Sequence, residues 1–389
     1  MKLKNNIVFG EPCIDDNFYK YLNSNLNSKW IGTGPLSKEF EKKFSSYKKT
    51  KFSLSVNSCT AAIFLSLKSL NLKKNDEVIT TPMTFCSTVN CIMHAGGKPI
   101  LVDIKDNTLN INEDKIEEKI NKNTKALLIV HFAGLPCNMT KIKKIASKYN
   151  LKLIEDCAHA IESKYKGKEV GNFGYSGCYS FYVNKNITTC EGGMVTTKNK
   201  DLSDFIVNNR LHGLSKDAWK RFFPTKQNKK IYYYDVLDSG YKFNMPDLNA
   251  SIGLSQLKSI QNFWLRRKKI YEYYLNNFSN LPVKLQEFNT KEITHAYHLF
   301  LFHIDKKKTK LTRDKLIEYL GKNKIGFGIH YRSINSMTYY KKKFNWSKND
   351  APIAYNVGEN TISLPLYPHL SDKKVDYISN KVINFFKKK

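Results

Sequence analysis

The feature that most constrains the fold is a regular alternation between about residue 52 and residue 200. Short apolar runs there are separated by stretches whose apolar residues recur at helical spacing, such as TAAIFLSLKSL (60–70) and MTKIKKIASKY (139–149). Strands that are apolar along their whole length are buried on both faces, which is typical of a mainly parallel sheet covered by helices on both sides. The sequence therefore predicts an α/β domain. Its strands are expected at DEVITT (76–81), KPILVDI (98–104), KALLIV (125–130), LKLIED (151–156), GCYSFY (177–182) and GGMVTT (192–197).

The rest of the chain predicts a second, smaller unit. At 389 residues, the chain is longer than one hydrophobic core usually serves. A helix over 248–269 is expected to connect the two parts, which gives a large α/β domain at 1–260 and a small α+β domain at 261–389. The small domain is expected to hold strands at 296–304 and 362–367 and helices at 312–323 and 372–386, with Thr312 and Ser371 as N-caps.

The charge does not indicate nucleic-acid binding, although the formal net charge is +30. Only six of the 64 basic residues are Arg, the residue best suited to reading bases, and the lysines are spread along the whole length. A solvated cationic surface, which would also attract an anionic substrate, is therefore favoured over a nucleic-acid surface.

The eight cysteines form no C-x-x-C pair, so neither a zinc site nor a disulfide framework is predicted and no metal is expected. The N-terminal stretch MKLKNNIVFGEP lacks an apolar core, and the apolar runs are too short to span a bilayer. These observations predict a cytoplasmic protein that does not enter a membrane.

Polar residues stand at the ends of several predicted strands, where ligands gather in open α/β sheets. LKLIED ends in Glu155 and Asp156, and GCYSFY runs through Ser180 towards Lys185. Lys185 follows a buried strand, and desolvation there is expected to lower its pKa and prepare its amine for nucleophilic attack and proton transfer.

Two further segments offer groups for a cofactor, and each has a second interpretation. SVNSCTAA (55–62) leads into a helix, so that Ser58, Thr60 and nearby N–H groups form either an anion site or an ordinary N-cap. Phe85 follows another strand and is either a core residue or a flat platform for a ring. Taken together, a lysine, a carboxylate, an anion site and an aromatic face match the needs of pyridoxal phosphate (PLP).

In these motifs the chain resembles the DegT/StrS family, the PLP-dependent nucleotide-sugar aminotransferases of fold type I. This resemblance implies an aspartate-aminotransferase-like fold, PLP as cofactor and an obligate homodimer with shared active sites. It covers nearly the whole chain, through WIGTGP (30–35), NSCTAA (57–62), DEVITTPMTF (76–85), KPILVDI (98–104), IEDCAHA (154–160), SFYVNKNITTCEGG (180–193), YKFNMPDLNASIGLSQL (241–257), HAYHLF (295–300) and SLPLYPHLS (363–371).

The resemblance also implies roles for individual residues. Lys185 corresponds to the lysine that forms the Schiff base and transfers protons, Asp156 to the partner of the pyridine nitrogen, and His159 to a neighbour of the cofactor's phenolic oxygen. The phosphate is expected at the turn containing Ser58, Cys59, Thr60 and Ala61, with Ser180, while Phe85 stacks on the ring and Asn244 reaches the phosphate of the partner subunit. Weaker candidates for substrate binding are His212, His330, Tyr331 and Arg332, of which Arg332 could meet a dicarboxylate donor.

Three residues depart from the family pattern. Cys59 and Cys190 stand where Gly or Ala is usual, and both are interpreted as packing residues. Tyr182 stands where many members have His. Tyr also occurs there in related sugar 3-dehydratases, but those enzymes replace the lysine with His, so Lys185 favours transamination.

The function that the resemblance implies is transfer of an amino group from L-glutamate to a keto group of a nucleotide-linked sugar, for surface glycan biosynthesis. The segments ITHAYHLF (293–300), IGFGIHYRSINSMTYYKKKF (325–344) and DAWKRF (217–222) are most similar to enzymes that aminate C4, such as the one that makes UDP-4-amino-4-deoxy-L-arabinose. Three alternatives remain: a C3-aminotransferase, a PLP-dependent sugar dehydratase, and a basic binding protein that kept the fold without catalysis.

Overall fold

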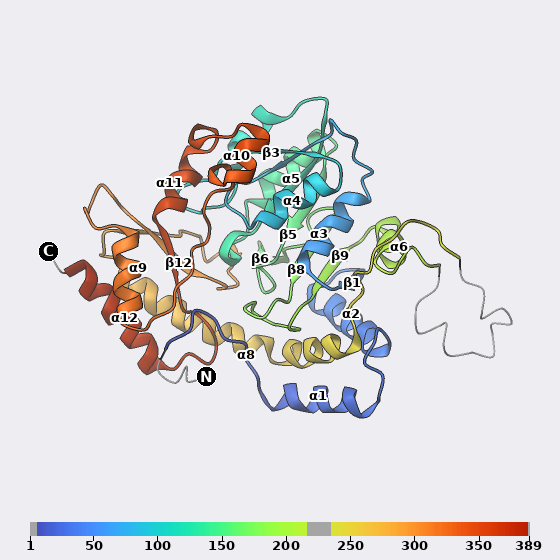
Figure 1. Cartoon of the computed structure of the whole chain (residues 1–389), viewed down its shortest axis with the longest axis horizontal. Helices are drawn as coiled ribbons and strands as arrows, with labels where there is room; N and C mark the ends of the chain where they lie inside the picture. The colour runs from blue at the N-terminus through green and yellow to red at the C-terminus, as the bar shows by residue number, and fades with distance from the viewer. Residues whose placement is uncertain (1–5, 216–234, 388–389) are drawn as a thin grey trace.

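The structure, a computed structural model, describes residues 6–215 and 235–387. The DAWKRF segment lies outside these residues. A seven-stranded sheet forms the centre of the larger part, in the order β1-β9-β8-β5-β4-β2-β3 (Figure 1). Its strands are β1 (Phe52–Val56), β2 (Glu77–Thr80), β3 (Lys98–Leu101), β4 (Thr124–Val130), β5 (Lys152–Asp156), β8 (Ser176–Ser180) and β9 (Gly193–Thr197).

The prediction of a mainly parallel, doubly covered sheet is confirmed. Every strand pair in this sheet is parallel except the two pairs that β9 makes with β1 and β8. Along β4, Leu127 belongs to one apolar cluster and Leu128 to another, because consecutive side chains point to opposite faces. The Leu128 face packs under α3 (Cys59–Lys68), α4 (Cys86–His94) and α6 (Lys200–Asn209), and the other face packs under α2 (Pro35–Lys48), α5 (Met139–Lys148) and α8 (Asp247–Phe278).

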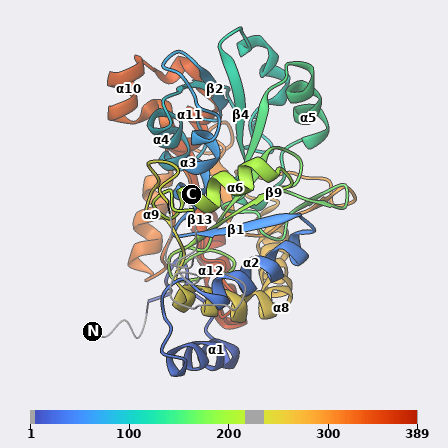
Figure 2. The same ribbon diagram turned by 90° about the vertical axis from the view of Figure 1, so that its right-hand side faces the viewer.

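Helix α8 is 32 residues long and belongs to both parts of the molecule. Its N-terminal half packs against α2 and α1 (Asp16–Asn27), and its C-terminal half reaches α12 (Asp372–Lys387), as Figures 1 and 2 show. Phe263 lies in the core below the large sheet, whereas Tyr274 and Phe278 lie in the core of the smaller part. The division proposed at residue 260 falls within this helix and stays a prediction.

The smaller part is built on an antiparallel sheet in the order β10-β12-β13, packed against α9 (Arg313–Lys322) and α12. The Thr312 side chain caps α9 by accepting the Lys315 N–H at 3.3 Å, as the sequence predicts. The first described residues also join this core, since Ile7 pairs with Ile325. The remaining elements are β6 (Lys164–Tyr165), β7 (Lys168–Glu169), β10 (Val283–Leu285), β11 (Ile293–Thr294), β12 (Phe300–Ile304), β13 (Thr361–Leu364), α10 (Thr338–Phe344) and α11 (Pro352–Asn360).

Two predicted strands of the smaller part are too long. The strand expected at 296–304 begins at Phe300, because Tyr297 adopts a left-handed backbone with φ of 52°. The strand expected at 362–367 ends at Leu364, since Pro365 has no N–H for the ladder. Among the described residues, the longest helices are too polar to cross a membrane.

Candidate active site

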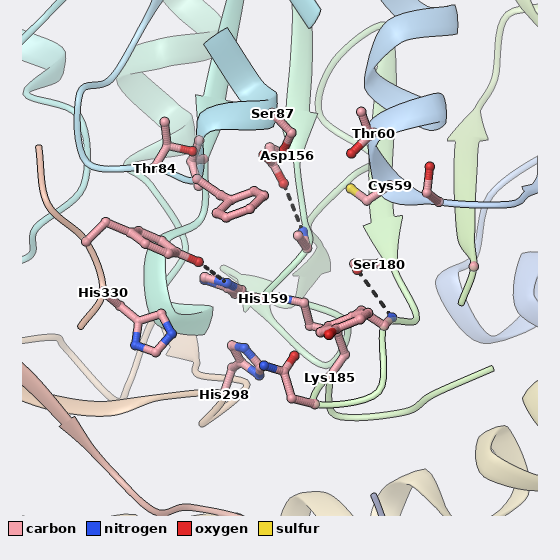
Figure 3. A pocket seen from close by; sticks show the side chains of 18 of the residues that line it. Cys59, Thr60, Thr84, Ser87, Asp156, His159, Ser180, Lys185, His298 and His330 are labelled. Atoms are coloured by element: carbon pink, nitrogen blue, oxygen red, sulfur yellow. Dashed lines mark hydrogen bonds between the residues drawn. The ribbon is translucent and has the colours of Figure 1, made fainter. Parts of the chain in front are cut away.

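A cavity of about 500 Å³ opens where β5 and β8 end, between the large sheet and the segments around residues 298 and 330. Figure 3 shows side chains from these separate segments pointing into one space. Ten of the predicted site residues line it: Ser58, Cys59, Thr60, Phe85, Asp156, His159, Ser180, Lys185, His330 and Tyr331.

Lys185 lies on the turn between β8 and β9, where its N–H donates to the Tyr182 carbonyl at 2.9 Å. Burial lowers the pKa of its ammonium group to about 8, and the nearby Asp156 carboxylate opposes this shift only in part. A lysine with this pKa exists partly as a neutral amine near neutral pH, so it can act as a nucleophile and as a proton carrier.

Asp156, the last residue of β5, brings a buried carboxylate to the same cavity. It accepts hydrogen bonds from Thr88 Oγ1 at 3.0 Å and from the Ala158 N–H at 3.1 Å. Burial raises the pKa of this carboxyl group, and the two hydrogen bonds and Lys185 counter the rise. Because a carboxylate can accept about four hydrogen bonds, Asp156 has capacity left for a cationic N–H donor in the cavity.

Glu155 precedes Asp156 and points to the other face of the sheet. It accepts hydrogen bonds from the N–H groups of Gly171 at 2.8 Å, Phe173 at 2.7 Å and Gly174 at 3.0 Å, and it contacts His131 Nε2 at 3.2 Å. The His131 Nδ1 atom accepts the Cys137 N–H, so Nε2 carries the proton that goes to Glu155. The Glu155 carboxylate is therefore fully used in holding the loop before β8.

The turn at residues 57–60 brings the start of α3 to the cavity. Its approach depends on Gly193 in β9, where a Cβ atom would lie 2.5 Å from the Ser58 carbonyl carbon. The Ser58 side chain caps α3 by accepting the Ala61 N–H at 3.1 Å, which leaves the N–H groups of Cys59 and Thr60 without partners among the described residues. A helix N-terminus with free N–H groups is suited to an anion.

An aromatic group and an imidazole cover the other side of the cavity. The Phe85 side chain is 59% exposed, which is not the environment of a core residue and agrees with a platform for a ring. His159 Nδ1 accepts the Ala133 N–H at 3.3 Å, so His159 Nε2 carries the proton and donates to Tyr331 Oη at 3.1 Å. Burial, together with Lys185 and His330, holds the pKa of His159 well below its usual range, so this imidazole is neutral.

Four predicted residues lie outside this cavity in the single chain. The Ala61 N–H already donates to Ser58 Oγ, and Asn244 contacts Thr33 Oγ1 and Lys242 beside β1. His212 sits on a turn with φ of 58°, and Arg332 lines a separate exposed hollow with Lys341 and Lys348.

The cavity also includes residues that the sequence prediction left out as site residues. Thr84 and Ser87 flank Phe85 after β2, where the rule that ligands gather at strand ends would have found them. Nothing in the sequence distinguishes His298, which lies on the loop before β12. The other additions are Val130, Ala158, Tyr182, Asn184, Glu191 and Gly192.

Comparison with known proteins identifies the chemistry of this cavity. The model of the DegT/DnrJ/EryC1/StrS aminotransferase family matches residues 12–383. The chain belongs to this family. It is 39% identical over 382 residues to the spore coat polysaccharide biosynthesis protein SpsC of Bacillus subtilis, covering 98% of this chain and 97% of SpsC. It is 44% identical over 371 residues to the uncharacterized protein MJ1066 of Methanocaldococcus jannaschii, covering 95% of both chains.

Solved structures of this aminotransferase family have the same fold. Spr1654 from Streptococcus pneumoniae, in its pyridoxamine phosphate (PMP) form, superposes with a TM-score of 0.90 at 31% identity, covering 98% of this chain and all of the other. Helicobacter pylori PseC, an aminotransferase involved in the biosynthesis of pseudoaminic acid, gives 0.90 at 28% identity, covering 98% and 99%. Spr1654 is also known in a PLP form. Our chain is thus a PLP-dependent sugar aminotransferase of fold type I, and the prediction of enzyme class, fold and cofactor is confirmed.

The residues present fit the cofactor. The Asp156 carboxylate has unused acceptor capacity, two N–H groups at the start of α3 have no partner in the part of the chain that the structure describes, and the exposed Phe85 ring lies at the same cavity as Lys185. These groups would hold the ring nitrogen, the phosphate and the face of the ring, respectively.

Proposed function

We propose that this aminotransferase transfers the amino group of L-glutamate to a keto group, at C4, of a nucleotide-linked sugar, and that the product enters a surface glycan. The observation that carries the proposal is the placement of Lys185 and Asp156 in one cavity whose other walls carry mostly neutral hydroxyl, amide, imidazole and aromatic groups, with Glu191 as the one further carboxylate that lines it. Such walls suit a sugar, which is recognised through neutral hydrogen bonds. The names of SpsC and PseC, which refer to a polysaccharide and to pseudoaminic acid, support a glycan product.

The roles of the protein side chains follow from their protonation. Bound PLP supplies an electron sink that stabilises negative charge on the carbon bonded to the amino group. The Lys185 amine would take the proton from that carbon of L-glutamate and place it on the cofactor carbon that receives the amino group, and it would move a proton in the reverse direction when the sugar is aminated. Its pKa of about 8 is well placed for both transfers. Asp156 keeps a proton on the ring nitrogen, because a buried carboxylate is stabilised by a cationic N–H partner.

Several finer parts of the proposal rest on the family resemblance. The C4 position is proposed because segments 293–300 and 325–344 are similar to those of the enzymes that make UDP-4-amino-4-deoxy-L-arabinose. L-Glutamate is proposed as the amino donor because it is the usual donor in the family. We also propose a homodimer in which Asn244 reaches the phosphate site of the partner subunit, and we retain His212 and Arg332 as the weaker candidates for substrate binding. Lys185 favours transamination over dehydration.

Two half-reactions test the proposal separately. In the first, PLP-loaded protein is mixed with L-glutamate, and conversion to the PMP form is followed by absorbance together with 2-oxoglutarate release. In the second, PMP-loaded protein is offered a panel of dTDP-, UDP- and GDP-linked 3-keto and 4-keto sugars, and products are identified by NMR. A C3-amino product would replace the proposed position, and failure to aminate any member of the panel would refute the proposed substrate class.

A further inference from the structure

His298 is a second imidazole in the active-site cavity, separate from His159. It lies on the loop before β12, lines the cavity with Lys185, and is only 5% exposed. Its ring stacks on that of His159 with centroids 4.4 Å apart (Figure 3). The family resemblance gives His159 a place beside the cofactor's phenolic oxygen, but no role has been assigned to His298.

The neighbours of His298 determine which of its ring nitrogens carries the proton. Asn186 Nδ2 donates to Glu162 Oε2 and to the Ala296 carbonyl, both at 2.8 Å. Both partners accept there, so the Asn186 amide is fixed with its oxygen towards His298. That oxygen lies 2.9 Å from His298 Nδ1, which must therefore donate. In a neutral ring Nε2 is then an unprotonated acceptor, and it has no partner among the described residues.

The His298 ring stays neutral for physical reasons. Burial lowers its pKa well below the usual range. The positive charges of Lys185 and Arg267, and those that His159 and His330 would carry if protonated, lower this pKa further. Arg267 is itself buried and donates to the His298 carbonyl at 3.4 Å. A neutral Nε2 lone pair attracts O–H and N–H donors, and it offers no proton to a carboxylate or a phosphate.

We propose that His298 Nε2 accepts a hydrogen bond from a ring hydroxyl group of the keto sugar, and that Asn186 is a positioning residue that fixes the tautomer this requires. This inference rests on the proposed function, since it assigns a specificity contact within the same site. It separates the two substrates, because the sugar offers hydroxyl donors, whereas L-glutamate, apart from the amino group that reacts, offers only carboxylates.

The tautomer is tested without turnover. Protein labelled with ¹⁵N-histidine, loaded with PLP, is examined by NMR, and the His298 signals are assigned by their absence in His298→Phe. Nδ1 is expected to be protonated and Nε2 unprotonated in the wild type. Asn186→Leu removes the acceptor opposite Nδ1 and should give a mixture of tautomers. A protonated Nε2 in the wild type would overturn the proposal.

The contact is tested with PMP-loaded protein and the keto sugar that the panel identifies. His298→Phe keeps an aromatic ring against His159 and should lower kcat/KM for the sugar about 5- to 100-fold, the range for leaving one buried polar group unpaired. Conversion of the PLP form by L-glutamate should change less than about twofold. Asn186→Leu should show the same selective loss to a smaller extent.

His295→Phe is the matched control. His295 is equally buried, accepts the Tyr297 N–H at 2.7 Å and contacts Gln286 at 3.3 Å, but it does not line the cavity. The His295→Phe variant should lose about as much stability as His298→Phe, but it should keep the wild-type ratio of the two half-reaction rates.

A second substrate series completes the test. Replacing the recognised hydroxyl with fluorine should slow the wild type but have little further effect on His298→Phe. Equal slowing of both half-reactions by His298→Phe, or equal sensitivity of both proteins to the fluoro sugars, would show that His298 does not read a hydroxyl group. If wild-type protein aminates none of the sugars, the proposed function itself fails, and this inference falls with it.

Discussion

Asp156 and Glu155 are adjacent carboxylates on opposite faces of β5, and their amide variants should fail in different ways. In Asp156→Asn, the side-chain oxygen can still accept the Ala158 N–H. The new NH₂ group can donate to Thr88, whose hydroxyl proton can turn to Thr84, 2.7 Å away. The fold is therefore expected to persist. Because the pKa of Asp156 is raised in the folded protein, its charge opposes folding above that pKa, so the cofactor-free variant should be as stable as the wild type or more stable at pH 7.

The catalytic cost of Asp156→Asn follows from the hydrogen bond that it weakens. A charge-assisted hydrogen bond contributes about 1.5–3 kcal/mol, which corresponds to roughly a 10- to 150-fold loss of rate. In Glu155→Gln an NH₂ group replaces one of the two oxygens that accept hydrogen bonds. This NH₂ group then faces N–H donors with which it cannot form a hydrogen bond. We expect a loss of about 2–4 kcal/mol in the free energy of unfolding.

The assay compares the two variants directly. Unfolding in urea is measured without cofactor, and the rate of the L-glutamate half-reaction is measured on protein loaded with PLP and shown to be folded. We expect Asp156→Asn to be stable but slow, and Glu155→Gln to be unstable while its folded fraction reacts at the normal rate. Near-normal rates in Asp156→Asn, or equal instability in both variants, would refute it.

Borohydride reduction of PLP-loaded protein should place the cofactor on Lys185 in peptide maps, and Lys185→Ala should abolish turnover; label on another lysine would remove this assignment. Burial lowers the pKa of Lys185 from 10.5 to about 8, so the free-energy cost of burying its charged form is full below pH 8 and disappears by pH 10.5. In urea titrations without cofactor, Lys185→Met should therefore be more stable than the wild type at pH 7 by at most about 3 kcal/mol, and this difference should shrink between pH 8 and pH 10.5. A difference in stability that does not change with pH would argue against a buried ammonium group. Mixing Lys185→Ala with Asn244→Ala subunits at limiting cofactor should restore about half of the wild-type activity per heterodimer, since one site in two is whole; subunit exchange seen by mass spectrometry without such a gain would mean that Asn244 serves its own chain.

The sequence predicted the sheet well, and where buried strands end in polar residues it pointed to side chains that the structure brings to one cavity. Asp156 and Lys185 stand out because a packing argument alone would not place them there. The reversed direction of β9 could not be predicted, since an apolar strand reads the same in both directions. The left-handed backbone conformation of Tyr297, which shortens β12, likewise depends on tertiary contacts and could not be predicted.

The histidines show the limit of such predictions most clearly. His295 and His298 belong to the same HAYH segment and are both buried, yet His298 lines the cavity and His295 contacts Gln286. Because neither local spacing nor hydropathy distinguishes them, the fold alone assigns the role. Asn244 marks a different limit, since its predicted partner lies on a second chain.

The long helix α8 has a consequence for how the molecule comes apart. Residues at its start pack below the large sheet and residues at its end pack in the core of the smaller part. A rigid element shared by two cores transmits the loss of either one to the other. The two parts should therefore melt in a single cooperative transition, and a chain cut near residue 260 would leave each fragment with half of a helix and no complete core.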